Sequence, residues 1–204
     1  AHVFDDPDFH RAVDKLKFAK KKYESKLKHY NGERYILDAT PITLLHPQFI
    51  SAAVNMCSNA KYIVMTRDPI ERAMSHYAMS KKRGLESHSP LAAFWHERKR
   101  MKGFYEALPL SPFESPYRDQ SYLIRSRYRQ QLNSLYRLVD KGNVTVLRQQ
   151  DLLSEHQQAL AKIFSFLDVS TIPITQEHVF NTENSYTLPL THRWLMKLYF
   201  MLRN

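Results

Sequence analysis

Glycine is scarce in this 204-residue chain, with only four residues, and none of them lies in a glycine-rich loop. The sequence therefore has no GxGxxG or GxxxxGK[ST] pattern, the loops in which backbone N–H groups cradle a phosphate. Cysteine occurs once, at Cys57, which excludes a disulfide framework within the chain and a thiolate zinc site. The ten histidines show no metal-ligand spacing, because His96-Glu97-Arg98-Lys99-Arg100 lacks the second histidine of HExxH.

Long apolar runs are also absent. No stretch of roughly eighteen or more apolar residues occurs, so the sequence predicts no membrane span, and no signal-peptide pattern opens the chain. Hydrophobic residues make up 43% and charged residues 25%, which is typical of a globular protein, and the length predicts a single domain over 1–204. Localisation stays open, with a bacterial cytoplasm favoured over a Golgi lumen.

Negative charge is in deficit. The formal net charge is +10, which favours anionic partners such as nucleotides, acidic glycans or nucleic acid, although a basic, solvated surface would give the same value. The chain has no RNP pattern or zinc finger, so nucleic acid is not the expected partner. A basic nucleic-acid-binding domain nevertheless remains an alternative.

Strand-like and helix-like segments alternate along the chain. Apolar runs predict strands at 34–38, 61–65 and 144–147. Periodic patterns predict helices over 6–29, 44–57 (after Pro47), 68–82, 90–101, 117–139, 152–167 and 191–202, with a loop at 103–116 and irregular chain at 170–190. This order predicts an α/β domain with a mainly parallel sheet and helices on both faces, and ligands in such sheets bind beyond the carboxyl ends of the strands.

The segment from Tyr62 to Tyr77, YIVMTRDPIERAMSHY, carries the main functional signal. Asp68 is a natural N-cap and Pro69 suits the first helical position, so a helix should start directly after the strand, with its free N–H groups beyond the sheet. Arg67 stands at that point, and Ser75 lies on the same helix face as Asp68. Together they predict a site for a dianionic phosphate. The structural alternatives are an ion pair for Arg67 and simple packing for Ser75, while a surface charge is favoured for Arg72 and a packed ring for Tyr77.

The pattern Thr66-Arg67-Asp68-Pro69, with Arg72, Ser75 and Tyr77, resembles the 3′-phosphate-binding segment of sulfotransferases that use PAPS (3′-phosphoadenosine 5′-phosphosulfate). Further segments are similar to that family in the same order: 35–41, Arg127-Tyr128, 144–152 and Phe166-Leu167. The resemblance implies a P-loop-NTPase-like three-layer fold. It implies that Arg67 and Ser75 bind the 3′-phosphate of PAPS, which would be the co-substrate, and that no metal takes part. It also implies transfer of a sulfuryl group to a hydroxyl or amine, with release of 3′,5′-ADP.

The chain departs from the family at several points. The Pro-Lys-x-Gly-Thr-Thr loop is missing, and 1–5 looks like the segment that follows it, so the family's catalytic base is expected just before Ala1. The domain is accordingly expected to be truncated or not fully represented at its N-terminus, and short at its C-terminus. The late loop at 181–186 lacks the family's Lys-Gly pair.

Within the chain, Asp38 ends a predicted strand near the expected acceptor site and is the candidate base, although it equally suits a cap for the Thr40-Pro41 turn. His46 is a candidate to face the same cleft, with a plain loop position as the alternative.

The acceptor is expected to be a glycan or small molecule. It would carry acidic groups if the basic cluster at 98–102 binds it. Two further alternatives remain: a catalytically incomplete nucleotide-binding module, and a P-loop kinase whose Walker loop lies upstream.

Overall fold

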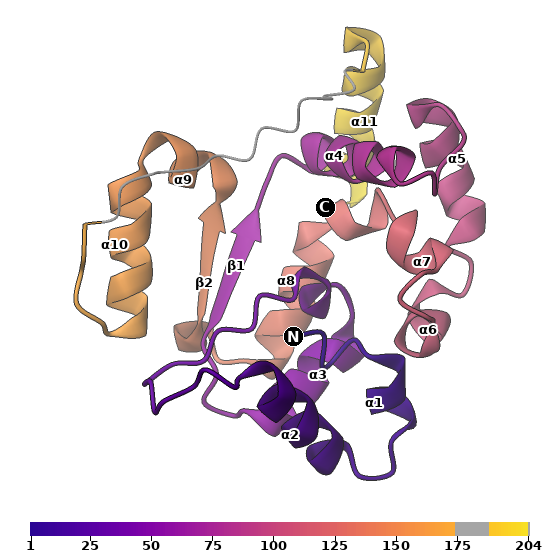
Figure 1. The fold of residues 1–204 in the computed structure, drawn as a ribbon. Helices are drawn as coiled ribbons and strands as arrows, with labels where there is room; N and C mark the ends of the chain where they lie inside the picture. Colours follow the sequence, from indigo (N-terminus) through magenta and orange to yellow (C-terminus); the bar gives the residue numbers. More distant parts are fainter. Residues whose placement is uncertain (174–187, 204) are drawn as a thin grey trace.

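The computed structural model describes residues 1–173 and 188–203. Short helices alternate with two strands in these residues, which confirms the predicted α/β class (Figure 1). The elements before the first strand are α1 (Pro7–Arg11), α2 (Lys15–Lys26), η1 (Pro41–Leu45) and α3 (Pro47–Met56). Between the strands lie α4 (Pro69–Lys82), α5 (Pro90–Arg100), α6 (Phe104–Ala107), η2 (Leu108–Leu110), α7 (Pro116–Asp119), η3 (Ile124–Ser126), α8 (Tyr128–Leu138) and η4 (Lys141–Asn143). After the second strand come α9 (Gln149–Ser154), α10 (His156–Leu167) and α11 (Leu190–Arg203).

The sheet of the described residues consists of two parallel strands, β1 (Tyr62–Thr66) and β2 (Val144–Arg148). Tyr62 lies opposite Val144 and Thr66 opposite Arg148, so both carboxyl ends lie at the same edge. The predicted parallel pairing is confirmed. The prediction of a third strand at 34–38 is wrong, because this segment extends along the surface with Leu37 82% exposed and pairs with neither strand.

Helices pack against the strands from two sides. Val64 of β1, Ile50 of α3, and Leu135 and Val139 near the end of α8 form one buried cluster beside the sheet. Helices α9 and α10 lie next to β2, away from α8 (Figure 1). The strand ends are therefore held between packed helices, which leaves the carboxyl edge as the place where polar side chains meet.

The predicted helix over 6–29 is two helices. Asp6 caps α1 by accepting the backbone N–H of Asp8, at 2.8 Å. A second cap, Asp14, accepts the N–H of Lys17 at 2.9 Å and starts α2 in a new direction. Val13, which lies at this break, is fully exposed, so no continuous apolar face runs from α1 into α2.

The predicted long helix over 117–139 is likewise interrupted. Its first part contains α7 and η3, and only α8 continues as a helix. The cause is a buried carboxylate from another helix: Glu97 accepts the N–H of Leu123 at 2.9 and 2.7 Å and the N–H of Ile124 at 2.9 Å. A local pattern cannot reveal these bonds from a distant residue. The loop predicted at 103–116 contains α6 and η2, and 152–167 covers the end of α9 and all of α10.

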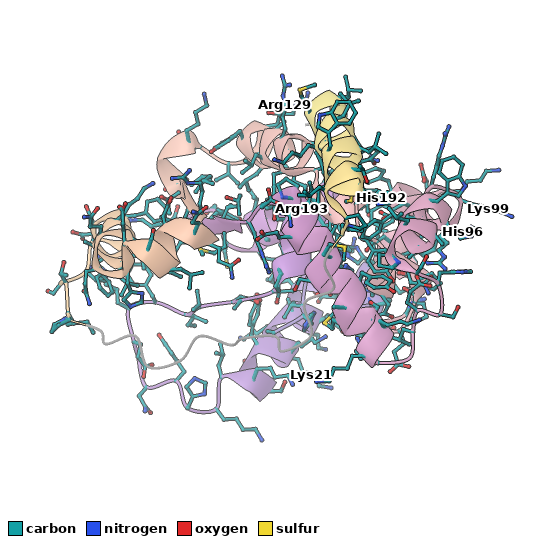
Figure 2. All side chains as sticks on the ribbon, turned by 90° about the horizontal axis from the view of Figure 1, so that it is seen from above. Lys21, His96, Lys99, Arg129, His192 and Arg193 are labelled. Atoms are coloured by element: carbon teal, nitrogen blue, oxygen red, sulfur yellow. The ribbon has the colours of Figure 1, made fainter. Side chains whose placement is uncertain are left out.

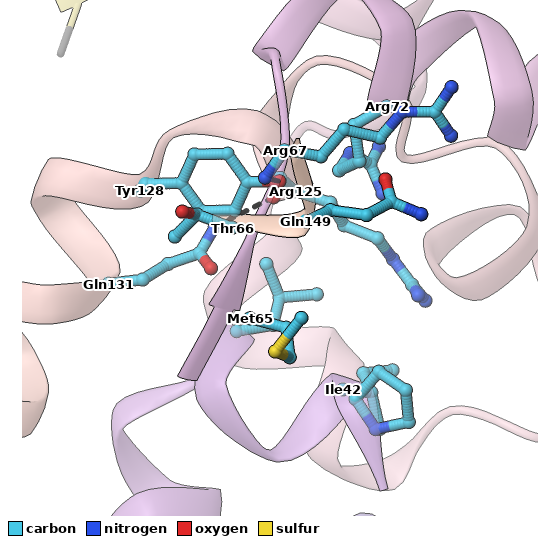
Figure 3. A pocket seen from close by; sticks show the side chains of 11 residues that line it. Ile42, Met65, Thr66, Arg67, Arg72, Arg125, Tyr128, Gln131 and Gln149 are labelled. Atoms are coloured by element: carbon cyan, nitrogen blue, oxygen red, sulfur yellow. Dashed lines mark hydrogen bonds between the residues drawn. The ribbon is translucent and has the colours of Figure 1, made fainter. Parts of the chain in front are cut away.

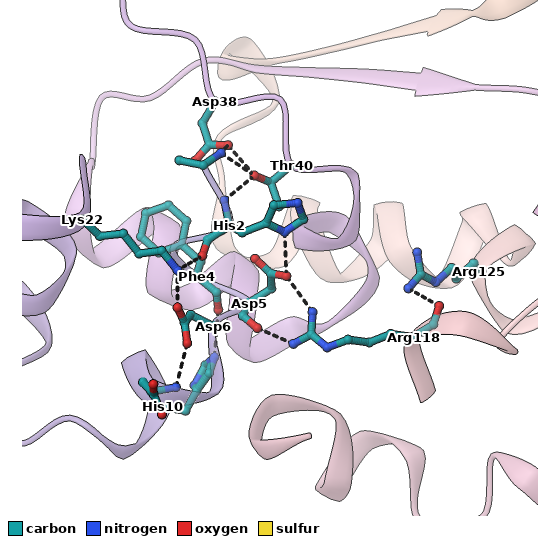
Figure 4. A network of polar contacts seen from close by, with 12 residues as sticks. His2, Phe4, Asp5, Asp6, His10, Lys22, Asp38, Thr40, Arg118 and Arg125 are labelled. Carbon is teal, nitrogen blue, oxygen red and sulfur yellow. Dashed lines mark hydrogen bonds and ion pairs between the residues drawn. The ribbon is translucent and has the colours of Figure 1, made fainter. Parts of the chain in front are cut away.

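A buried ion pair joins the start of the chain to α7 (Figure 4). The Arg118 guanidinium donates to the Asp5 carboxylate at 2.7 Å and also to the Asp5 carbonyl oxygen. Asp5 is fully buried and Arg118 is 6% exposed. Because His2 contacts the same carboxylate at 3.0 Å, this network fixes the first residues against the body of the domain.

The final helix α11 packs Met196 and Phe200 against Ile70, Ala73 and neighbouring residues of the core, and confirms the helix predicted at 191–202. Most of the segment predicted to be irregular, 170–190, lies outside the described residues, and so does the late loop at 181–186. Across the described parts of the chain, no helix is long and apolar enough to cross a membrane.

Candidate functional site

The carboxyl edge of the sheet is built as the sequence predicts. β1 ends at Thr66, Arg67 follows, and Asp68 caps α4 with Pro69 at its first position. The Asp68 carboxylate accepts the N–H groups of Ile70 at 3.0 Å and Glu71 at 2.9 Å, and its carbonyl oxygen accepts that of Arg72 at 2.9 Å. The prediction of free N–H donors at this helix start is therefore wrong, since the cap itself occupies them. An anion at this edge must be held by side chains.

A cavity of about 300 Å³ opens beside Arg67 at this edge (Figure 3). Three of its lining side chains are guanidinium groups, and none is a carboxylate. The cavity is lined by Pro41, Ile42, Leu45, Met65, Thr66, Arg67, Arg72, Arg125, Tyr128, Gln131 and Gln149. Its size suits a small organic ligand, and its charge suits an anion.

Arg67 is the least constrained of the three arginines. Its side chain is 38% exposed, and its Nε atom lies 3.6 Å from Glu71 Oε2. The other oxygen of that carboxylate, Oε1, lies 3.7 Å from Arg193 Nη2. A pair at this exposure and distance contributes little free energy, so the guanidinium can turn to a ligand at small cost. The backbone N–H of Arg67 donates to the Tyr128 hydroxyl at 3.3 Å, which connects the end of β1 to α8.

Arg72 points inward rather than into solvent, so the surface position predicted for it is wrong. Its Nε donates to Ser126 Oγ at 2.6 Å, and its Nη2 donates to the Tyr122 carbonyl oxygen. Burial lowers the pKa of Arg72 to about 10, and the neighbouring Arg67 charge acts in the same direction. Arg72 is thus charged at neutral pH and held in one orientation. Tyr77 is 1% exposed and packed in the core, as predicted.

Arg125 is a cavity residue that the sequence patterns do not predict. Its Nε donates to Ser121 Oγ at 2.9 Å, and its Nη2 to the Arg118 carbonyl oxygen at 2.9 Å. Burial, followed by the charge of Arg72, lowers the pKa of Arg125 to about 9. The one sequence signal for this residue is its place in the segment that contains Arg127 and Tyr128.

The other predicted site residues lie apart from the cavity lining. Ser75 is half-buried on α4 and does not line the cavity. His46 is 3% exposed and caps α3: its Nδ1 accepts the N–H of Gln48 at 3.1 Å, and its Nε2 lies 2.7 Å from the Tyr105 carbonyl oxygen. Both ring nitrogens are therefore used inside the protein, and burial lowers the His46 pKa. The predicted cleft-facing position of His46 is not what the structure shows.

Asp38 does not end a strand, because no strand forms at 34–38. The carboxylate instead accepts the Tyr23 hydroxyl at 2.8 Å and the amino group of Ala1 at 2.9 Å. It also accepts the Thr40 hydroxyl (Figure 4). Burial opposes the charged form, but these hydrogen bonds outweigh it and lower the Asp38 pKa. A carboxylate held in this way is a weak base and links α2 to the Thr40-Pro41 turn.

The comparisons with known proteins agree with this fold. A family model described as the sulfotransferase family matches residues 2–173, more than half of the chain. The chain belongs to the sulfotransferase family. Among solved structures, this sulfotransferase is similar to a sulfotransferase from Alicyclobacillus acidocaldarius, at 20% identity and a TM-score of 0.73, over 99% of this chain and 78% of that chain.

A second solved structure, the sulfotransferase domain from the curacin biosynthetic pathway, matches at 20% identity and a TM-score of 0.51. The match covers 76% of this sulfotransferase and 46% of that chain. No curated protein sequence matches the present chain. At these identities the two structures establish the fold, and they confirm the predicted P-loop-like α/β architecture.

Proposed function

We propose that this sulfotransferase uses PAPS as its donor, with Arg67 and Ser75 as ligands of the 3′-phosphate. The observation that carries the proposal is the position of Arg67, directly after β1 at the edge where parallel sheets bind ligands, in a cavity lined by cations. Its guanidinium fork suits bidentate contact with a phosphate, and its weak pair with Glu71 leaves it available. Ser75 lies two turns into α4, outside the cavity lining, and we propose that its hydroxyl donates to the same group from that side.

In the proposed reaction, a hydroxyl or amine of the acceptor attacks the sulfur atom of PAPS. The bond between sulfur and the bridging phosphate oxygen breaks, a new bond from sulfur to the acceptor forms, and 3′,5′-ADP leaves with the bridging oxygen. A base takes the proton of the acceptor. Asp38 is the proposed base within the chain, although its lowered pKa makes it a weak one. We propose a glycan or a small molecule as the acceptor.

A calorimetric titration with 3′,5′-ADP tests the nucleotide site, with 5′-AMP as the ligand that lacks the 3′-phosphate. We expect 3′,5′-ADP to bind more tightly than 5′-AMP, and Arg67→Ala to abolish that preference. A charge-assisted hydrogen bond contributes roughly 1.5–3 kcal/mol, so the loss should be about ten- to a hundredfold in Kd. Ser75→Ala should give a smaller loss of the same preference.

Arg129→Ala is the matched control, because Arg129 lies on the exposed side of α8 and its removal changes the net charge equally. Equal affinity for the two nucleotides, or equal losses in Arg67→Ala and Arg129→Ala, would refute the 3′-phosphate site. Binding without turnover of any acceptor would instead indicate the nucleotide-binding module without catalysis.

A nucleic-acid-binding domain would show a different result, namely binding that weakens steeply with salt and does not depend on a 3′-phosphate. The exposed basic side chains labelled in Figure 2, including Lys21, Lys99 and Arg129, lie in different regions and do not form one stripe. In the predicted basic cluster at 98–102, Arg100 turns inward and pairs with Glu86 at 2.5 Å.

A further inference from the structure

Two guanidinium groups of the cavity have no role in the proposed function. Arg72 and Arg125 come from different elements, α4 and η3, and both line the cavity beside Arg67. Each uses Nε and Nη2 on fixed acceptors of the protein. Within the described residues, neither Nη1 group has a hydrogen-bond partner, so each arginine keeps donors in a fixed plane. This arrangement is preorganised for a ligand that accepts hydrogen bonds.

The charge of these two arginines is not neutralised by an ion pair. Among the described residues neither forms a salt bridge, and no carboxylate lines the cavity. The nearby Glu97, which influences Arg72, directs both oxygens to the N–H groups of Leu123 and Ile124. Burial lowers the pKa values of Arg72 and Arg125, and a neighbouring positive charge acts in the same direction on each, Arg67 on Arg72 and Arg72 on Arg125, so holding these charges costs free energy. A bound anion would offset that cost.

The opposite wall of the cavity is apolar. It consists of Pro41, Ile42 and Leu45 from η1, together with Met65 of β1. Ile42 and Leu45 are each 5% exposed and belong to a packed cluster, so this wall is firm. A ligand that fits both walls has an anionic group for the arginines and an apolar body for η1.

We propose that Arg72 and Arg125 form a second oxyanion subsite, beside Arg67, for a carboxylate, sulfate or phosphate group attached to an apolar body. The inference goes beyond the proposed function, because it concerns two residues that the 3′-phosphate does not require. The anionic group belongs either to the acceptor or to a second part of the nucleotide. The chemistry of the subsite is the same for both.

Phenyl phosphate is a suitable probe, with inorganic phosphate and phenol as the two half-ligands. In calorimetry, we expect saturable binding of phenyl phosphate, weaker binding of inorganic phosphate, and no binding of phenol. Arg125→Gln should weaken phenyl phosphate roughly tenfold or more, since it removes a charge-assisted donor. Arg129→Gln on the exposed side of α8 removes the same charge and should change the affinity less than twofold.

The unmodified protein provides a test that does not depend on the folding of a variant. Saturating phenyl phosphate should raise the Tm of the wild type more than inorganic phosphate does at equal concentration, because only the native state has the cavity. A wild type without saturable phenyl phosphate binding would overturn the proposal. Equal affinity in the wild type and a folded Arg125→Gln variant would overturn it as well.

Competition with 3′,5′-ADP identifies the source of the anionic group. If both ligands bind together, the subsite serves the acceptor; if they exclude one another while Arg125→Gln weakens both, it serves the nucleotide. The two proposals fail separately. Selective 3′,5′-ADP binding without phenyl phosphate binding refutes only the subsite, and the reverse result refutes only the 3′-phosphate site.

Discussion

Glu97 lies outside the cavity lining, yet its removal should damage both stability and the site. Its carboxylate is 3% exposed and is the acceptor for the N–H groups of Leu123 and Ile124. Glu97→Ala leaves both N–H groups without this acceptor in a buried place. Each unsatisfied group costs about 1–3 kcal/mol, so the expected loss in the free energy of unfolding is roughly 2–6 kcal/mol. That is a large share of the ~5–15 kcal/mol typical of a domain.

The damage should extend to the arginines, because the turn that Glu97 holds also carries Arg125 and supplies the acceptors of Arg72, namely Ser126 and Tyr122. A loosened turn gives both guanidinium groups more orientations. We therefore expect phenyl phosphate to bind more weakly to any folded Glu97→Ala protein, although Glu97 does not line the cavity.

Urea denaturation followed by circular dichroism measures the stability loss, and calorimetry measures the binding loss. Glu24→Ala is the control, since Glu24 is exposed on α2 and its replacement should change stability by less than about 0.5 kcal/mol. A loss below about 1 kcal/mol in Glu97→Ala, or an unchanged affinity for phenyl phosphate, would show that these hydrogen bonds do not fix the turn.

Three further results are expected. Burial raises the pKa of Glu97 to about 7, so the stability that Glu97 contributes is fully present below its ordinary pKa of 4.5 and is lost as pH rises through 7. In urea denaturation at a series of pH values, the wild type should lose about 3 kcal/mol of unfolding free energy relative to Glu97→Gln over this range, and parallel plots of unfolding free energy against pH would contradict it. Arg118→Met leaves the buried Asp5 carboxylate without its arginine partner and should lower the free energy of unfolding, measured by urea denaturation, by about 3–5 kcal/mol. The double variant Arg118→Met/Asp5→Leu should regain much of this loss, and an equally unstable double variant would show that the unpaired carboxylate is not the cause. Asp68→Ala removes the cap of α4 and should lower the Tm by an amount equivalent to about 1 kcal/mol, while Asp68→Asn should keep a Tm close to that of the wild type. An unchanged Tm in Asp68→Ala would show that the cap does not contribute to stability.

The parts of the site that the sequence predicts correctly depend on local information. The apolar run of β1, the cap at Asp68 and the proline at the next position determine a strand, a turn and a helix within a few residues. Arg67 therefore lies where the pattern places it. The same local reading fails at 34–38, where an apolar run has no neighbouring strand with which to pair.

The cavity depends on contacts that no local pattern contains. Arg72 resembles a surface arginine in its own helix, and only Ser126 and Tyr122, some fifty positions later, turn it inward. The break before α8 likewise depends on Glu97, which belongs to a different helix. Sequence reasoning thus finds the arginine that follows a strand but not the arginines that tertiary contacts bring to it.

The occupied start of α4 decides how an anion can be held at this edge. Helix N-termini usually bind phosphates through free backbone N–H groups, but here Asp68 takes those of Ile70 and Glu71. Favourable charge must then come from side chains, and the described part of the edge supplies three guanidinium groups for it. The site therefore depends on arginine, and its affinity should respond to arginine substitutions more than to changes in the helix cap.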